Sequence, residues 1–274
     1  IADVTHYVTP GSVVDNEAVE RATSVYLVDR TVPMLPERLC NELCSLRPNE
    51  DKLCFSAVFT LNENLEIVEE WFGRTVIHSD RRFAYEEAQA VIESGEGDFK
   101  EEILTLNRLA QTLRKERFKH GAIAFERDEV RFHLDEKGKP VGVYTKVQKE
   151  ANQLIEEFML LANRIVAAEI GRKKKDGDNQ DKETKPFVYR VHDNPDPEKI
   201  SKLSTFIKRF GLHLKTSSDS KTTHKHINAL LDDCQGRACQ TLVETLTIRS
   251  MAKAVYSTDN IGHYGLAFPY YTHF

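Results

Sequence analysis

The stretch Ala22–Ser56, ATSVYLVDRTVPMLPERLCNELCSLRPNEDKLCFS, decides the fold of this chain of 274 residues. Its apolar segment Ser24–Val28 predicts a strand that carries Tyr26. Two prolines, Pro33 and Pro36, then restrict the backbone. Because proline lacks the N–H that the first turn of a helix leaves unpaired, Pro36 is expected to open a short helix. The stretch therefore predicts a strand, a turn and a helix in succession.

The flanking segments predict further short elements. Upstream, Ile1–Val8 alternates as a strand does, and Asp15–Ala22 predicts a helix capped by its own first residue. Downstream, Phe55–Leu61 and Leu65–Phe72 surround an Asn-Glu-Asn turn, which predicts a hairpin. We expect Trp71, near the end of that hairpin, to close onto the core.

The rest of the chain mixes helical and strand patterns. Helical periodicity covers Tyr85–Glu93, Phe99–His120, Val147–Gly171, Pro197–Gly211, Thr222–Asp233 and Arg237–Tyr256. Strand patterns cover Ala122–Glu126, Val130–Asp135, Val141–Lys146, Phe187–Val191 and His263–Phe274. This order lacks βαβ alternation, so we predict an α+β domain with a mixed, mainly antiparallel sheet surrounded by helices. The charged segment Arg172–Lys185 is expected to be a flexible loop.

Composition narrows the classes of function. A net charge of −5 and a pI near 6.1 argue against nucleic-acid binding through bulk basicity, although a locally basic channel stays compatible with them. Five cysteines, an odd number without a signal peptide, indicate reduced thiols. The sequence shows no membrane span and no targeting motif, so we expect a cytoplasmic protein that has no membrane partner.

Several long motifs occur along the chain in a fixed order. They are IADVTHYVTPGS (Ile1–Ser12), TSVYLVDR, VPMLPERL, LCSLRPNEDKLCFS, LIEEFMLLAN (Leu154–Asn163), YRVHDNPDPEK (Tyr189–Lys199) and IRSMAKAVYSTDNIGHYGLAF (Ile248–Phe268). Together they resemble the catalytic RNB domain of the ribonuclease II and ribonuclease R family of exoribonucleases, and their wording is closer to bacterial ribonuclease R. The resemblance covers nearly the whole chain and implies that residues 1–274 form part of one such domain.

The resemblance implies a 3′→5′ exoribonuclease that acts as a monomer in RNA decay. Such an enzyme hydrolyses single-stranded RNA to nucleoside 5′-monophosphates with Mg²⁺. In this family the metal-binding aspartates lie just before the strand that begins here at Ile1, and an arginine that assists at the phosphate lies beyond Phe274. We therefore expect a piece of a longer protein, with no catalytic or metal-binding residue inside the chain and no activity of this piece alone.

The resemblance also implies three RNA-binding residues. Tyr26 matches a tyrosine that stacks near the 3′ end of the RNA, and Phe125 matches an aromatic residue that clamps the terminal bases with it. Glu156, the first of two consecutive glutamates in an apolar helix, matches a residue near the nucleotide 2′-OH. The alternatives are that both rings belong to the core, and that Glu156 forms a salt bridge with Arg190 or Arg249.

Other polar residues admit weaker interpretations. His192, Asp193 and His263 could serve as acid–base groups, but no nucleophile stands at a motif spacing, which favours structural or channel-lining roles. His224–His226 is expected to be a polar loop with weak metal-binding potential. Two rival functions remain open: a catalytically inactive RNA-binding or scaffold protein of the same fold, and a metal-independent hydrolase that uses His192.

Overall fold

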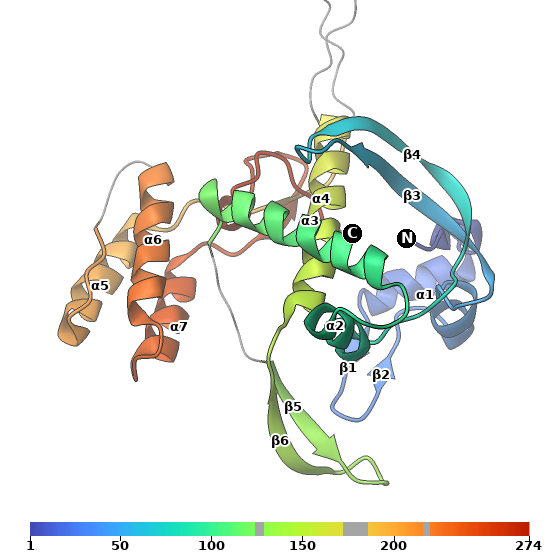
Figure 1. Ribbon diagram of the computed structural model, residues 1–274, viewed down its shortest axis with the longest axis horizontal. Helices are drawn as coiled ribbons and strands as arrows, with labels where there is room; N and C mark the ends of the chain where they lie inside the picture. Colours follow the sequence, from blue (N-terminus) through green and yellow to red (C-terminus); the bar gives the residue numbers. More distant parts are fainter. Residues whose placement is uncertain (124–128, 172–185, 216–219, 274) are drawn as a thin grey trace, which may run out of the picture. The chain divides into compact units, whose positions relative to one another are not determined.

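The computed structural model describes residues 1–123, 129–171, 186–215 and 220–273, and its contacts divide the chain into two compact units. The first unit comprises residues 1–98 and 127–149, and the second comprises residues 99–126 and 150–274 (Figure 1). Helices and strands are mixed without βαβ alternation, and the named strands pair antiparallel, so the α+β class is confirmed. The described strands form four two-stranded sheets instead of one larger sheet.

The first unit is built mainly from hairpins. Its elements are η1 (Val4–His6), α1 (Val13–Arg21), β1 (Val25–Tyr26), β2 (Thr31–Val32), η2 (Arg38–Leu43), β3 (Asp51–Leu61), β4 (Ile67–His78), α2 (Tyr85–Ser94), β5 (Glu129–Leu134) and β6 (Pro140–Lys146). The predicted strand at Ile1–Val8 is wrong, because only Ala2 forms a bridge, with Cys54, before the chain turns into η1. The capping residue also differs: the hydroxyl of Ser12 accepts the N–H of Asp15, so α1 begins earlier than expected.

The predicted hairpin of β3 and β4 is confirmed, with Asp51 opposite His78 at its open end. Trp71 does not close onto a core, however, because half of its surface is exposed. The indole lies across Gly73, where a Cβ atom would stand only 2.5 Å from the Trp71 ring carbons. Residues two apart share one face of a strand, so the absence of a side chain at Gly73 leaves room for the Trp71 ring.

The second unit is mainly helical. Its elements are α3 (Lys100–Lys119), α4 (Glu150–Gly171), β7 (Tyr189–Val191), α5 (Pro197–Ile207), η3 (Lys208–Phe210), α6 (Ser220–Cys234), α7 (Gln240–Ser250), β8 (Val255–Ser257) and η4 (Tyr264–Leu266). The long helix expected to reach Tyr256 stops at Ser250, and residues beyond it form β8 against β7. The predicted strand His263–Phe274 is wrong, since Gly262 and Ala267 adopt positive φ angles and interrupt any extended run.

The main hydrophobic core of the second unit lies among α5, α6 and α7, which lie side by side in Figure 1. Its fully buried members include Ile207, Leu212, Ile227, Leu230 and Val243. Helix α5 starts as the sequence predicts, with Pro197 at its first position and the Asp196 carboxylate accepting the N–H of Glu198. In the part of the chain that the structure describes, no helix combines the length and the apolar character needed to cross a bilayer.

Candidate functional site

Tyr26 lies in the first unit, on the two-residue strand β1, opposite Thr31 of β2. Its side chain is 80% exposed, so it is not a core residue. The same hairpin also exposes the apolar side chains of Val25, Leu27, Val28 and Val32. Because nothing in the first unit covers most of the phenol ring, the ring is available to stack on a ligand.

The two consecutive glutamates lie on α4 in the second unit and have different surroundings. Glu157 is buried and receives hydrogen bonds from Arg117 of α3: Nε donates to both carboxylate oxygens at 3.2 Å, and Nη2 donates to Oε1 at 2.5 Å. Nη2 also donates to Oε1 of Glu156 at 3.3 Å, while the Glu156 side chain stays 41% exposed. The expected alternative partners Arg190 and Arg249 are therefore wrong, because Arg117 is the arginine that Glu156 contacts.

A buried tyrosine lies near Glu156. Burial is the main cause that raises the pKa of Tyr271, and the charge of Glu156 adds to this rise, whereas a hydrogen bond from Asn163 and the charge of Arg190 lower it. The Tyr271 hydroxyl also contacts Nδ1 of His273 at 3.1 Å. An amide, a phenol and an imidazole thus lie together, and such groups can donate to and accept from a sugar hydroxyl.

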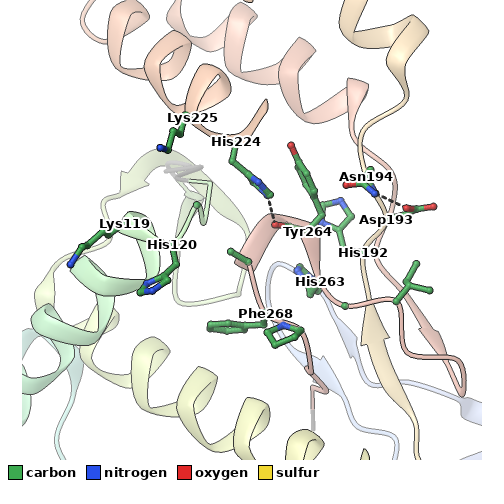
Figure 2. Close-up of a pocket in the computed structure, with 15 residues that line it drawn as sticks. Lys119, His120, His192, Asp193, Asn194, His224, Lys225, His263, Tyr264 and Phe268 are labelled. Atoms are coloured by element: carbon green, nitrogen blue, oxygen red, sulfur yellow. Dashed lines mark hydrogen bonds between the residues drawn. The ribbon is translucent and has the colours of Figure 1, made fainter. Parts of the chain in front are cut away.

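Figure 2 shows a pocket of about 790 Å³ inside the second unit, which we call the histidine pocket. Its walls come from the end of α3, from the segment after β7, from α6 and from the loop around η4. They comprise residues 119–121, 192–194, 224–225, 261–264 and 267–269. Segments that are distant in the sequence therefore meet at this pocket. His224–Lys225 lies on α6, so the expected polar loop at residues 224–226 is wrong.

Hydrogen bonds fix the imidazoles of the histidine pocket. The Nδ1 atom of His192 accepts the N–H of Gly265 at 3.0 Å, so Nε2 carries the proton that it donates to the Ala252 carbonyl at 2.9 Å. Both nitrogens of His192 are thus engaged, and neither is left to act as a base. This geometry argues against the metal-independent hydrolase that would use His192.

The remaining rings form a continuous set of contacts. His224 stacks on Tyr264 with centroids 3.8 Å apart, and its Nε2 lies 2.9 Å from the Tyr264 carbonyl (Figure 2). His263 contacts His192 at 5.0 Å on one side and Tyr271 at 5.1 Å on the other. Burial, with a smaller effect of His192, lowers the pKa of His263 to about 4. The buried His263 imidazole is therefore neutral near pH 7, and its ring also contacts the ring of Tyr271.

The structure does not test every predicted residue. Phe125 lies outside the described residues, and Tyr26 and Glu156 belong to different units. Within the described ranges, no three His, Cys, Asp or Glu side chains gather in a way that could hold a metal ion.

Sequence reasoning missed Arg117, which only its helical spacing on the buried face of α3 could have indicated. It also missed Tyr264, the neighbour of the histidine in the GHYGL motif.

Comparisons with known proteins define the class of this chain. The RNB domain model matches residues 1–274, so the chain belongs to the RNB domain family, and the resemblance found in the motifs is confirmed. It is 40% identical to Ribonuclease R of Thermotoga maritima and 38% identical to DIS3-like exonuclease 2 of Schizosaccharomyces pombe, in both cases over 100% of this chain. The chain spans 38% and 31% of those relatives, which is less than half of their length.

Solved structures agree with this class. RNase R of Mycoplasma genitalium, solved in complex with ribose-methylated single-stranded RNA, matches with a TM-score of 0.87 and 26% identity over 100% of this chain and 42% of that one. Yeast Ssd1, described as a pseudonuclease, matches with a TM-score of 0.72 over 100% of this chain and 33% of that one. At 22% identity the second match shows the shared fold alone. The fold therefore does not by itself decide whether a member is a nuclease.

Proposed function

We propose that this chain is the RNB part of a 3′→5′ exoribonuclease that hydrolyses single-stranded RNA to nucleoside 5′-monophosphates. The observation that carries the proposal is the match of the RNB domain model over the entire chain. Its support comes from the 40% identity to a Ribonuclease R and from the likeness to an RNase R that binds single-stranded RNA. We also propose that the protein is monomeric and cytoplasmic.

Three side chains are proposed to hold the RNA. Tyr26 stacks on a base near the 3′ end, and its 80% exposure supports this role. Phe125 is proposed as the second stacking ring. Glu156 is proposed to accept the 2′-OH of a nucleotide, because its carboxylate is half-exposed while Arg117 holds it in place. A contact with the 2′-OH would separate RNA from DNA.

We propose that hydrolysis requires Mg²⁺, which would activate water and stabilise the charge that develops at the phosphate. The described residues do not supply a set of oxygen ligands for such an ion. The chain's own groups are therefore assigned to binding and orienting the RNA. The fixed carboxylate of Glu156 and the exposed ring of Tyr26 are suited to that task.

A decay assay on the full-length protein tests the proposal. A 5′-labelled single-stranded RNA should shorten stepwise from its 3′ end with release of nucleoside 5′-monophosphates, and EDTA should stop the reaction. A DNA strand of the same sequence should be degraded far more slowly. Internal fragments, or decay that persists in EDTA, would refute the proposal.

A second candidate is an RNA-binding protein without nuclease activity. The likeness to the pseudonuclease Ssd1 in fold favours keeping this candidate. It predicts that the same RNA binds in the presence of Mg²⁺ and stays intact. The decay assay, read together with a filter-binding measurement on the same sample, separates the two functions.

A further inference from the structure

We propose that Arg117 and Glu157 are positioning residues, which orient the carboxylate of Glu156 and thereby set the preference of the protein for RNA over DNA. Neither Arg117 nor Glu157 is assigned a contact with the RNA itself. The inference rests on the proposed contact between Glu156 and a nucleotide 2′-OH, and it extends that contact to the buried pair behind it. Three observations carry it: the burial of the pair, the geometry of its hydrogen bonds, and the single engaged oxygen of Glu156.

The pair of Arg117 and Glu157 is buried between two helices. Arg117 comes from α3 and Glu157 from α4, and these helices pack against each other in the second unit (Figure 1). Only 6% of the Arg117 side chain and 3% of the Glu157 side chain are exposed. Removing two charges from water is costly, and apolar side chains often stabilise such a contact equally well. The burial of both charges therefore points to a role besides joining the helices.

The hydrogen bonds fix the guanidinium of Arg117 in one plane. Nε donates to both carboxylate oxygens of Glu157 at 3.2 Å, and Nη2 donates to Oε1 of the same residue at 2.5 Å. The guanidinium also lies over the ring of Phe118, with Cζ 4.8 Å from the centroid. Because a guanidinium is rigid and planar, fixing one edge fixes the direction of every other N–H. Glu157 thus determines where else Arg117 can donate.

The second acceptor is Glu156. Nη2 of Arg117 donates to Oε1 of Glu156 at 3.3 Å, so one nitrogen contacts both glutamates. Consecutive residues of a helix point about 100° apart, so Glu156 can leave the buried face on which Glu157 stays. The Glu156 side chain is 41% exposed, and none of the described residues donates a hydrogen bond to its Oε2 atom. One oxygen is therefore held by Arg117, and the other stays available to a ligand.

A carboxylate held in this way favours a hydroxyl as its ligand. It accepts the 2′-OH of a ribose, whereas a deoxyribose offers no donor at that position. It also repels a phosphate, so it distinguishes the sugar and does not bind the backbone charge. A freely rotating glutamate must lose conformational entropy to make this contact, whereas a glutamate fixed by Arg117 has already lost it. The buried pair therefore strengthens the discrimination without touching the sugar.

Binding of short single strands to the full-length protein in EDTA tests the inference, because chelation prevents metal-dependent cleavage during the measurement. The probes are an all-RNA strand and strands of the same sequence in which one nucleotide at a time is 2′-deoxy; fluorescence anisotropy gives each Kd. We expect one 2′-deoxy position to weaken binding to the unmodified protein about tenfold, as for a lost hydrogen bond to a charged group. Glu156→Ala should bind this strand and the all-RNA strand within about twofold of each other.

The variant Arg117→Met/Glu157→Leu tests the positioning role. It replaces the buried pair by apolar side chains and keeps the net charge, a change that is often neutral for stability, whereas either single replacement leaves a buried charge unpaired. We expect the discrimination at the same 2′-deoxy position to fall to about threefold or less. Because Glu156 itself is unchanged, this loss reports on the orientation of its carboxylate. Urea titration verifies that the variant folds.

A second variant, Arg117→Lys, keeps a cation opposite Glu157. An ammonium lacks the planar fork that joins the two glutamates, so the discrimination should again fall to about threefold or less. If Arg117→Lys instead retains the full discrimination, charge alone suffices and the positioning role is wrong. This variant tests the inference even if the double replacement does not fold.

The matched control is Gln111→Leu/Gln153→Leu. It removes a hydrogen bond of 3.1 Å between the same two helices and leaves Arg117 and both glutamates in place. Its discrimination should stay within about twofold of that of the unmodified protein. A loss as large as that of the pair variant would assign the effect to loosened helix packing and overturn the inference.

The remaining outcomes separate the inference from the proposed function. If Glu156→Ala loses the discrimination while the pair variant keeps it, the pair is structural only. If Glu156→Ala keeps it, or if the unmodified protein binds every 2′-deoxy strand equally, the proposed 2′-OH contact is refuted together with the inference. RNA that stays intact with Mg²⁺, while the pair variant loses discrimination as expected, would refute the exoribonuclease and support the positioning role.

Discussion

Several aromatic side chains of the two units have opposite environments. In the first unit they lie on two-stranded hairpins and are exposed, as for Tyr26, Trp71 and Phe132. In the second unit Tyr264, Tyr271 and other rings are buried against histidines and helices. Exposed rings are free to stack on a ligand, whereas buried rings position their neighbours. The same residue type is therefore exposed on the hairpins of one unit and packed against its neighbours in the other.

The difference follows from how each unit buries surface. A two-stranded hairpin has two faces and buries little apolar area by itself. The helices α5, α6 and α7 instead surround a common core, and α3 packs against α4 through the pair of Arg117 and Glu157. Changes in the second unit should therefore cost more stability than changes at exposed residues of the first.

The largest loss of stability is expected from Arg117→Ala. It leaves the carboxylate of Glu157 buried without its main partner, which should reduce the free energy of unfolding by about 3–5 kcal/mol. Arg21→Ala, which removes an exposed ion pair with Glu17 in the first unit, should cost less than about 1 kcal/mol. Urea titrations measure both. Equal losses for the two variants would contradict the comparison of the units.

Acid should destabilise the second unit next most strongly. The unfolded chain protonates His263 near pH 6.5, whereas burial delays protonation in the folded state to about pH 4. The stability from the neutral imidazole is thus complete above pH 6.5 and is lost as the pH falls toward 4, by at most about 3 kcal/mol. The lowered pKa of His192 acts in the same direction.

Unfolding measured between pH 7 and pH 4 tests this effect, with His263→Gln as the variant that should flatten the curve. An NMR titration of the His263 ring provides an independent measurement, because its midpoint should lie near pH 4. A midpoint at the ordinary value near 6.5 would show that the ring is not buried in solution.

A smaller loss of stability is expected for Gly73→Ala in the first unit. The new Cβ would stand 2.5 Å from the Trp71 ring, so the indole must move, at a cost of about 1 kcal/mol. Because Trp71 is the only tryptophan of the chain, its fluorescence should report the movement. Gly142→Ala on β6 is the control, since its Cβ would meet His133 at an ordinary 3.5 Å. Unchanged emission from Gly73→Ala would disprove the contact.

The smallest effect on stability should come from Tyr26→Ala, within about 0.5 kcal/mol, because the side chain is exposed. If the ring stacks on RNA as proposed, binding of single-stranded RNA should nevertheless weaken by about 1–3 kcal/mol. Tyr26→Phe keeps the ring and should bind nearly as well as the unmodified protein. An insoluble or unfolded Tyr26→Ala would show that the ring supports the fold instead.

The sequence predicted local features with good accuracy. Pro197 behind Asp196 marked the start of α5, and the turn at Asn62–Asn64 marked the hairpin of β3 and β4. The predictions from sequence were wrong where contacts between distant segments determine the local structure. The apolar run from His263 resembles a strand, yet Gly262 and the bridges of His263 to His192 and Phe268 fold it into a loop.

The sequence by itself determined the family, the α+β class and the positions of most helices, because order of motifs, periodicity and capping residues are properties of the chain. Only the tertiary structure decided that Glu157 is the buried glutamate and Arg117 its partner, that Tyr26 faces solvent, and that four histidines meet at one pocket. These facts depend on which distant segments pack together, and local sequence patterns do not encode burial of that kind.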